Sequence, residues 1–131
     1  RFLNDPERFL KLVERTRAVT ASLPSAQVGI APHSLRAVTP ESLRMLVSQA
    51  GAGPIHIHVA EQVKEVDDCI AWSERRPVEW LLDNVAVDQR WCLIHATHMT
   101  CDEARRVAAS GAVVGLCPIT EASLGDGIFN G

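Results

Sequence analysis

Ile55-His56-Ile57-His58-Val59-Ala60-Glu61 places two imidazoles and a carboxylate at the end of an apolar run. Its β-branched residues, with Gly51-Ala-Gly-Pro54 before them, predict a buried strand over residues 55–60. Side chains repeat every two residues along a strand, so His56 and His58 should face the same side. Glu61 lies three residues beyond His58, where a strand would give way to a loop.

A second apolar run, Trp91-Cys-Leu-Ile-His-Ala-Thr-His98, also ends in histidines. Four of the five histidines therefore lie at or near the ends of two predicted strands. In parallel β/α folds, ligands bind at the C-terminal ends of the strands. Metal-dependent hydrolysis is a chemistry that would place histidines there.

Strands and helices alternate along the chain. Capping patterns predict helix starts at Asp5-Pro6, at Thr39-Pro40, and at Thr100, which forms a capping box with Glu103. The predicted helices cover about residues 5–23, 39–51, 62–72, 77–84 and 100–111; the strands cover 27–31, 55–60, 91–95 and 112–117, with a polar, Gly-rich loop over 118–131. This α/β order predicts parallel pairing. Four such units are half of an eight-stranded (β/α)8 TIM barrel, and a small doubly wound sheet is the alternative.

The composition excludes several classes of protein. A chain of 131 residues with 47% hydrophobic and 22% charged residues should fold, at the size of one domain. The net charge of −3 and the lack of a basic stripe argue against nucleic acid and anionic membranes as partners. No apolar run approaches the roughly 20 residues of a membrane helix. The four cysteines lack CxxC spacing, which favours buried, reduced thiols in a cytoplasmic protein.

The strand ends supply the candidate catalytic residues. His58 could bind zinc through a neutral imidazole, and Glu61 could exchange a proton with metal-bound water and a leaving amine. His95, at the end of the next strand, could bind metal or hold the water and the substrate. His56 should lie deeper, packed beneath the site, and His98 should be structural or peripheral.

Further candidates follow the first and last strands. His33 and Arg36 come after residues 27–31, and an arginine there suits recognition of a carboxylate. Thr120, Glu121 and Asp126 could contact substrate or satisfy backbone groups of a turn. Trp72, Trp80 and Trp91 are expected to pack in the core or between the barrel and its helices.

Longer motifs resemble the amidohydrolase superfamily, and within it the deiminases that act on N-formimino-L-glutamate. The matching runs are His33-Ser-Leu-Arg36, His56-Ile-His-Val-Ala-Glu-Gln62, Asp67-Asp-Cys-Ile-Ala-Trp72, Arg76-Pro-Val-Glu-Trp-Leu-Leu82, His95-Ala-Thr-His98 and Cys117-Pro-Ile-Thr-Glu-Ala-Ser-Leu-Gly-Asp-Gly-Ile-Phe129. The histidine motifs mark only the metal-dependent deaminases, whereas the fourth and last runs are specific to the deiminases.

The resemblance implies a (β/α)8 barrel with one catalytic zinc ion, of which residues 1–131 form the central part, about strands four to seven. It assigns His58 as a zinc ligand, Glu61 as the acid/base, His95 to the hydrolytic water and substrate, and His33 and Arg36 to substrate binding. The implied reaction is hydrolysis of N-formimino-L-glutamate to N-formyl-L-glutamate and ammonia, in histidine degradation, by a cytoplasmic enzyme that is a homodimer when complete. The family's His-x-His pair on the first strand and its aspartate on the eighth have no counterpart in the chain.

Two other functions remain open from the sequence. One is another deaminase or a chlorohydrolase of the same superfamily, acting on a ring amidine that offers Arg36 no dicarboxylate. The other is an inert half-barrel that associates with another chain through exposed sheet edges.

Overall fold

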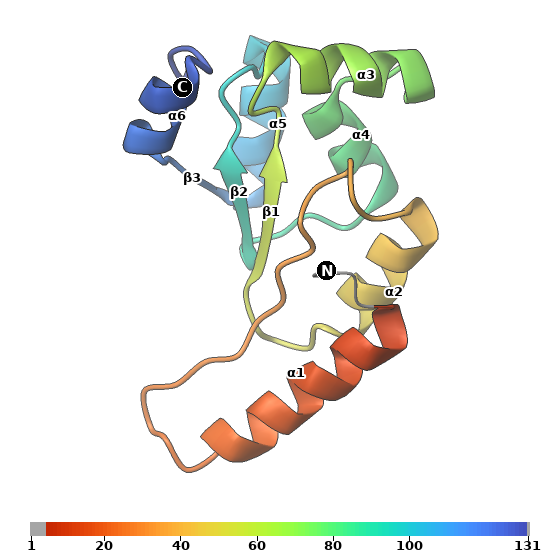
Figure 1. Ribbon diagram of the computed structural model, residues 1–131, viewed down its shortest axis with the longest axis vertical. Coiled ribbons are helices and arrows are strands. Elements are labelled where there is room, and N and C mark those ends of the chain that lie inside the picture. Colours follow the sequence, from red (N-terminus) through yellow and green to blue (C-terminus); the bar gives the residue numbers. More distant parts are fainter. Residues whose placement is uncertain (1–4, 131) are drawn as a thin grey trace.

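The computed structural model describes residues 5–130, which form three parallel strands and six helices (Figure 1). The strands β1 (Ile55–Val59), β2 (Trp91–His95) and β3 (Val113–Gly115) are hydrogen-bonded in that order. The helices are α1 (Pro6–Thr20), α2 (Pro40–Gln49), α3 (Val63–Ser73), α4 (Pro77–Asn84), α5 (Cys101–Ser110) and α6 (Pro118–Leu124). Both strand pairs are parallel, as predicted, so their carboxyl ends meet at one edge of the sheet.

Hydrogen bonds confirm the predicted helix starts. The side chains of Asp5 and Thr39 each accept a backbone N–H from the first turn of the helix that follows. Thr100 and Glu103 form the predicted capping box, and Gly111 ends α5 with a left-handed φ of 79°. Among residues 5–130, no helix is both long and apolar enough to cross a membrane.

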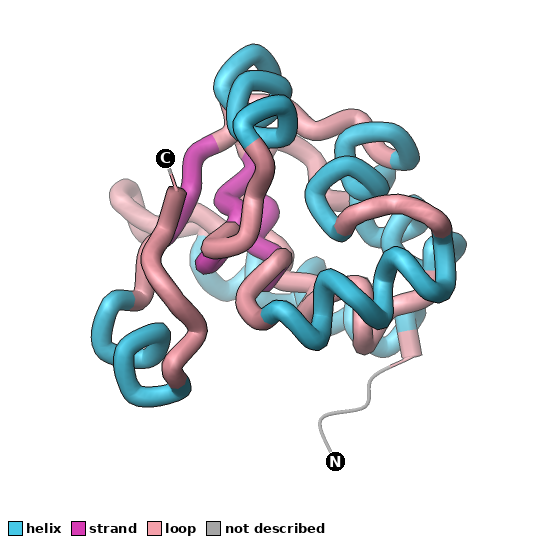
Figure 2. The backbone as a smooth tube through the Cα atoms, turned by 90° about the horizontal axis from the view of Figure 1, so that it is seen from above, coloured by secondary structure: helices cyan, strands magenta, loops and turns pink. Residues whose placement is uncertain are grey.

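The two faces of β1 differ in burial, as its sequence alternation predicts. Ile55, Ile57 and Val59 are buried, whereas His56 is exposed and His58 is partly exposed. The buried face packs toward the helices, and α5 and α6 lie on opposite sides of the strands (Figures 1 and 2). Strand β1 therefore keeps one apolar face in the core and presents His56 and His58 on the other.

The core confirms the packing predicted for two of the three tryptophans. Trp91 on β2 and Trp80 on α4 are buried, but Trp72 on α3 is 55% exposed, so the prediction for Trp72 was wrong. The Trp72 ring lies against Trp80, with their centroids 5.4 Å apart. Its indole therefore covers the edge of the core rather than filling it.

All four cysteines are free thiols, as predicted. Cys69 is buried, Cys92 and Cys117 are partly buried, and Cys101 at the start of α5 is exposed, which corrects the expectation that each would be buried. Burial raises the pKa of the Cys69 and Cys92 thiols, which disfavours their reactive thiolates.

The segment predicted as a strand over 27–31 is not a regular strand. Only Ile30 and Ser34 form isolated parallel bridges, with Ile55 and His58 respectively. Pro32 lies between the two bridges and has no N–H to donate, so a continuous ladder cannot form. The segment nonetheless runs beside β1 and brings the residues after it to the same edge of the sheet.

The loop predicted over 118–131 contains a helix, α6. Pro118 occupies its first turn, where a missing N–H costs no hydrogen bond, and Gly125 ends it with a left-handed φ of 69°. The Glu121 carboxylate accepts the backbone N–H of Cys117, the residue before the helix. The preceding strand is also shorter than predicted, 113–115 instead of 112–117.

Candidate active site

The candidate residues gather at the carboxyl edge of the sheet, where β1 and β2 end. His58 and His95 are at the ends of β1 and β2, and Glu61 follows β1. Arg36 reaches them from the segment beside β1, and Glu121 from α6. Five segments of the chain thus converge on one site.

His58 is held in a single orientation by the backbone. Its Nδ1 lies 2.8 Å from the carbonyl oxygen of His33. A carbonyl can only accept, so Nδ1 is the donor and Nε2 keeps its lone pair. Metal-binding histidines commonly donate the N–H of their other ring nitrogen to a carbonyl oxygen in this way. The donor chemistry of His58 therefore fits a zinc ligand.

His33 lies beside His58, with ring centroids 5.0 Å apart. Its Nδ1 makes a 2.9 Å hydrogen bond with Oγ of the buried Ser34. His33 was predicted to bind substrate. In the structure it also has a second role, because its carbonyl oxygen orients the His58 ring.

His95 enters the site because the backbone leaves the extended conformation. Strand register pairs His95 with Val59, one residue beyond His58, on the buried side of the sheet. Its φ of 70°, followed by 48° at Ala96, departs from strand geometry. The His95 ring stacks on the His58 ring with centroids 5.6 Å apart, and only 3% of the residue is exposed.

Glu61 is fixed through its backbone and through contacts with two neighbouring side chains. The buried carboxylate of Glu65 accepts the N–H groups of Ala60 and Glu61 at 3.0 and 2.9 Å. Glu61 Oε1 lies 3.3 Å from His95 Nε2, and Glu61 Oε2 lies 3.2 Å from the Arg36 guanidinium. The carboxylate predicted to move protons is therefore beside both other candidate groups.

Arg36 reaches the site as predicted, but it is already paired. Its guanidinium contacts Glu61 at 3.2 Å and Glu65 at 3.8 Å, with 39% of its side chain exposed. Arginine has five N–H donors, so this pairing leaves donors for a further anion. Arg36 therefore lies beside Glu61 and Glu65 while part of its side chain stays exposed.

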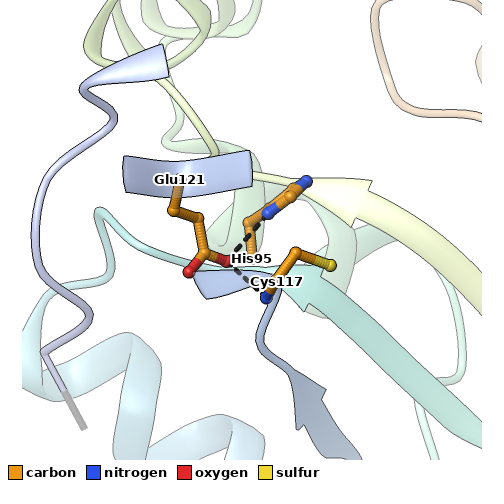
Figure 3. Close-up of side chains that lie close together, drawn as sticks. All are labelled: His95, Cys117 and Glu121. Carbon is orange, nitrogen blue, oxygen red and sulfur yellow. Dashed lines mark hydrogen bonds and ion pairs between the residues drawn. The ribbon is translucent and has the colours of Figure 1, made fainter. Parts of the chain in front are cut away.

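Glu121 was named from the sequence, with Thr120 and Asp126, as able to contact substrate or to satisfy turn backbone; it does the second and also bonds to His95. Its Oε1 accepts the Cys117 N–H at 2.8 Å and lies 2.9 Å from His95 Nδ1 (Figure 3). The Cys117 N–H, and then His95, lower the pKa of the Glu121 carboxyl. The signal in the sequence was weak because residues 118–131 were predicted as loop, where a glutamate has no defined direction.

His95, Cys117 and Glu121 also offer three potential metal-ligand atoms within 4.8 Å of one another. The Glu121 oxygen in this group already takes two hydrogen bonds, which a metal ion would displace. Hydrogen bonds account for the contacts of Glu121 with His95 and with the Cys117 backbone N–H; they do not involve the Cys117 thiol.

The two remaining histidines lie away from these contacts. His56 shares the face of His58 but is exposed rather than packed beneath the site, which corrects its predicted burial. The His98 backbone bonds to Ala60 and to the Arg76 side chain, which fits the structural role predicted for it. Its Nε2 is buried without a partner among the described residues.

Comparison with known proteins identifies the family. The sequence model of the amidohydrolase family matches residues 4–130. The chain belongs to the amidohydrolase family. A formimidoylglutamate deiminase of Pseudomonas aeruginosa is 55% identical over 130 residues, which are 98% of this amidohydrolase chain and 28% of that protein.

Solved structures confirm the predicted partial barrel. A Brucella melitensis amidohydrolase matches with a TM-score of 0.95 and 60% identity, over 99% of this chain and 29% of that one. An adenosine deaminase from Xanthomonas campestris with bound zinc has a TM-score of 0.87 over 93% of this chain and 28% of its own; at 24% identity it supports the fold alone. This amidohydrolase chain thus spans under a third of the length of these relatives.

Proposed function

We propose that the protein carrying this chain hydrolyses N-formimino-L-glutamate to N-formyl-L-glutamate and ammonia, with zinc as its cofactor. The observation that carries this proposal is the Glu61–His95 contact of 3.3 Å beside the oriented His58 ring. The 55% identity to a formimidoylglutamate deiminase supports the choice of substrate.

His58 would hold zinc through Nε2, since Nδ1 is committed to the His33 carbonyl. Zinc, when bound, supplies a hydrolytic water with a lowered pKa. Further protein ligands would be needed, because catalytic zinc sites commonly have three.

Glu61 would move the protons of the reaction. Its carboxylate takes a proton from the attacking water, whose oxygen bonds to the formimino carbon. It passes that proton to the formimino nitrogen, then carries the second proton of the water from the resulting hydroxyl to the same nitrogen, which leaves as ammonia as the C–N bond breaks and the formyl C=O forms. Glu65 keeps this carboxylate in place by holding the Ala60 and Glu61 N–H groups.

Arg36 and His33 would recognise the substrate away from the reacting carbon. The substrate has two carboxylates, and the Arg36 donors not used by Glu61 can bind one of them. Ring amidines of nucleobases offer no such carboxylate, so Arg36 favours the dicarboxylate substrate over a nucleobase.

The test is ammonia release by the complete purified protein from N-formimino-L-glutamate, with adenosine and guanine as competing substrates. We expect turnover of the first substrate and little or none of the other two. Glu61→Gln should retain bound metal and lose roughly 10²–10⁴-fold in kcat, because the amide cannot exchange a proton. Preferential deamination of adenosine or guanine would contradict the proposal, and near-normal kcat in the variant would remove Glu61 from the mechanism.

A further inference from the structure

His95 lies between two carboxylates that come from different parts of the chain. Its Nδ1 is 2.9 Å from Glu121 Oε1 on α6, and its Nε2 is 3.3 Å from Glu61 Oε1 after β1. The His95 side chain is only 4% exposed. Both ring nitrogens therefore face protein groups, and solvent has little access to the ring.

The hydrogen bonds of Glu121 decide which nitrogen of His95 is the donor on that side. The same Glu121 oxygen accepts the backbone N–H of Cys117 at 2.8 Å, an interaction that favours the ionised carboxylate. An ionised carboxylate only accepts hydrogen bonds. A bare Nδ1 lone pair facing it at 2.9 Å would be repelled, so Nδ1 must carry a proton.

We propose that Glu121 is a positioning residue, which holds His95 with a proton on Nδ1 and directs Nε2 toward Glu61 and the reacting groups. The proposal rests on the proposed function, in which Glu61 and His95 act on the substrate. Glu121 itself touches neither the substrate nor Glu61 in this assignment, and acts through the imidazole.

The backbone conformation of His95 is an independent reason to expect a contact that holds its side chain in place. His95 and Ala96 both have positive φ, 70° and 48°, a conformation that non-glycine residues adopt at a cost. Such residues persist where the surrounding structure holds them. The bond from α6 to the imidazole is one of the contacts that hold this turn, and Figure 3 shows the Glu121 side chain directed at it.

The test compares the complete protein with its Glu121→Gln variant. The variant keeps the size of the side chain, but its amide can turn an NH₂ group toward Nδ1 and favour the opposite tautomer, as in other carboxylate–histidine pairs. We expect kcat to fall by roughly 100-fold or more, with KM changed less than about threefold. In the ¹⁵N spectrum of histidine-labelled protein, the His95 Nδ1 resonance should be that of a protonated nitrogen in the wild type and should shift in the variant.

Glu103→Gln is the matched control, because Glu103 is another buried glutamate that makes no contact with His95. It should lower the melting temperature without moving the His95 resonances. A folded Glu121→Gln protein with kcat within threefold of wild type would overturn the proposal. So would a wild-type spectrum in which Nδ1 is unprotonated, a result that needs no variant to fold. The spectrum can be recorded on a protein that does not turn over substrate. A wild-type protein inactive on N-formimino-L-glutamate would therefore contradict the proposed function, and the spectrum would still test the role of Glu121.

Discussion

At the scale of single residues, the site is a line of charged and titratable groups that share partners. Arg36 contacts Glu61, Glu61 contacts His95, and His95 contacts Glu121. Removing one member therefore changes the environment of the next. Each substitution in this line needs a readout that separates binding from turnover.

Arg36→Met should alter substrate selectivity. The change removes the donors proposed to bind a substrate carboxylate and also releases Glu61 from its ion pair. The release of Glu61 acts equally on all substrates. The ratio of kcat/KM between two substrates therefore isolates the loss of the carboxylate-binding donors. Because the Arg36 side chain is 39% exposed, solvent screening should limit the effect to about a tenfold change in the ratio of kcat/KM.

The comparison substrate is a formimino compound that lacks both carboxylates. N-formimino-L-glutamate should lose activity mainly through a higher KM, and the comparison substrate should lose less. Arg36→Lys should not restore the selectivity, because lysine lacks the planar fork of donors. Equal losses for both substrates would assign Arg36 to the positioning of Glu61 alone.

Glu121 should make the protein sensitive to acid. Its pKa is lowered in the folded state, first by the Cys117 N–H and then by His95. A carboxyl with a lowered pKa contributes stability above its unfolded pKa, about 4.3 for glutamate, and the contribution is lost as the pH falls through the folded value. The free energies of unfolding of wild type and Glu121→Gln, measured in denaturant, should differ at pH 7 and converge below about pH 4. A difference that stays constant from pH 7 to pH 3 would contradict this account.

At the scale of elements, a second buried glutamate ties two helices together. The Glu103 carboxylate accepts from Arg76 Nε at 3.0 Å, from the Glu79 N–H at 3.2 Å and from the Thr100 N–H at 2.7 Å. It thus serves the first turns of both α4 and α5. The Arg76 side chain also bonds to the carbonyl of His98, in the loop that follows the carboxyl end of β2.

Glu103→Ala should destabilise the protein strongly. It removes three hydrogen bonds and leaves the Arg76 guanidinium, 30% exposed, without its carboxylate. Breaking a buried pair typically costs about 3 kcal/mol or more. Thermal unfolding should show a clear loss, and Asp102→Ala is the control, since that neighbouring carboxylate pairs with Arg105 while 84% exposed. Equal effects of the two substitutions would show that Glu103 is not the tie between the helices.

The elements also show where sequence patterns were sufficient. Helix starts at Asp5, Thr39 and Thr100 are local events, because each cap and its N–H groups lie within one turn. The strand ends bearing His58 and His95 could likewise be predicted from apolar runs.

Other features depend on contacts between distant segments. Helix α6 was not predicted from the sequence. Its position depends in part on the hydrogen bond between Glu121 and His95, which are 26 residues apart in the chain. The direction of the His95 ring depends on the positive φ of that residue. The alternation of side chains along a regular strand does not predict such a φ. The pairing of Arg36 with Glu61 joins residues 25 apart, and the sequence pattern did not predict it.

At the scale of the whole molecule, the chain is proposed to supply one side of a zinc site. Side chains from α6 and from four other segments lie at the carboxyl edge of the sheet. Among residues 5–130, His58 is the proposed zinc ligand, because its Nδ1 is bonded to the His33 carbonyl and its Nε2 keeps a lone pair. The related proteins are more than three times as long as this chain. A complete set of ligands is therefore expected from the rest of the barrel.

The 131-residue chain alone should not retain stoichiometric zinc after dialysis, whereas the complete protein should retain about one ion per site. One imidazole cannot hold zinc tightly, because catalytic sites commonly use three protein ligands. Elemental analysis of both samples by mass spectrometry measures this directly. If the short chain does retain zinc, His58→Ala and Cys117→Ala identify where. Loss with the first substitution would place an adequate site at the end of β1, against the expectation of shared ligands. Loss with the second would mean that zinc displaces the hydrogen bonds of Glu121 and binds between His95, Cys117 and Glu121.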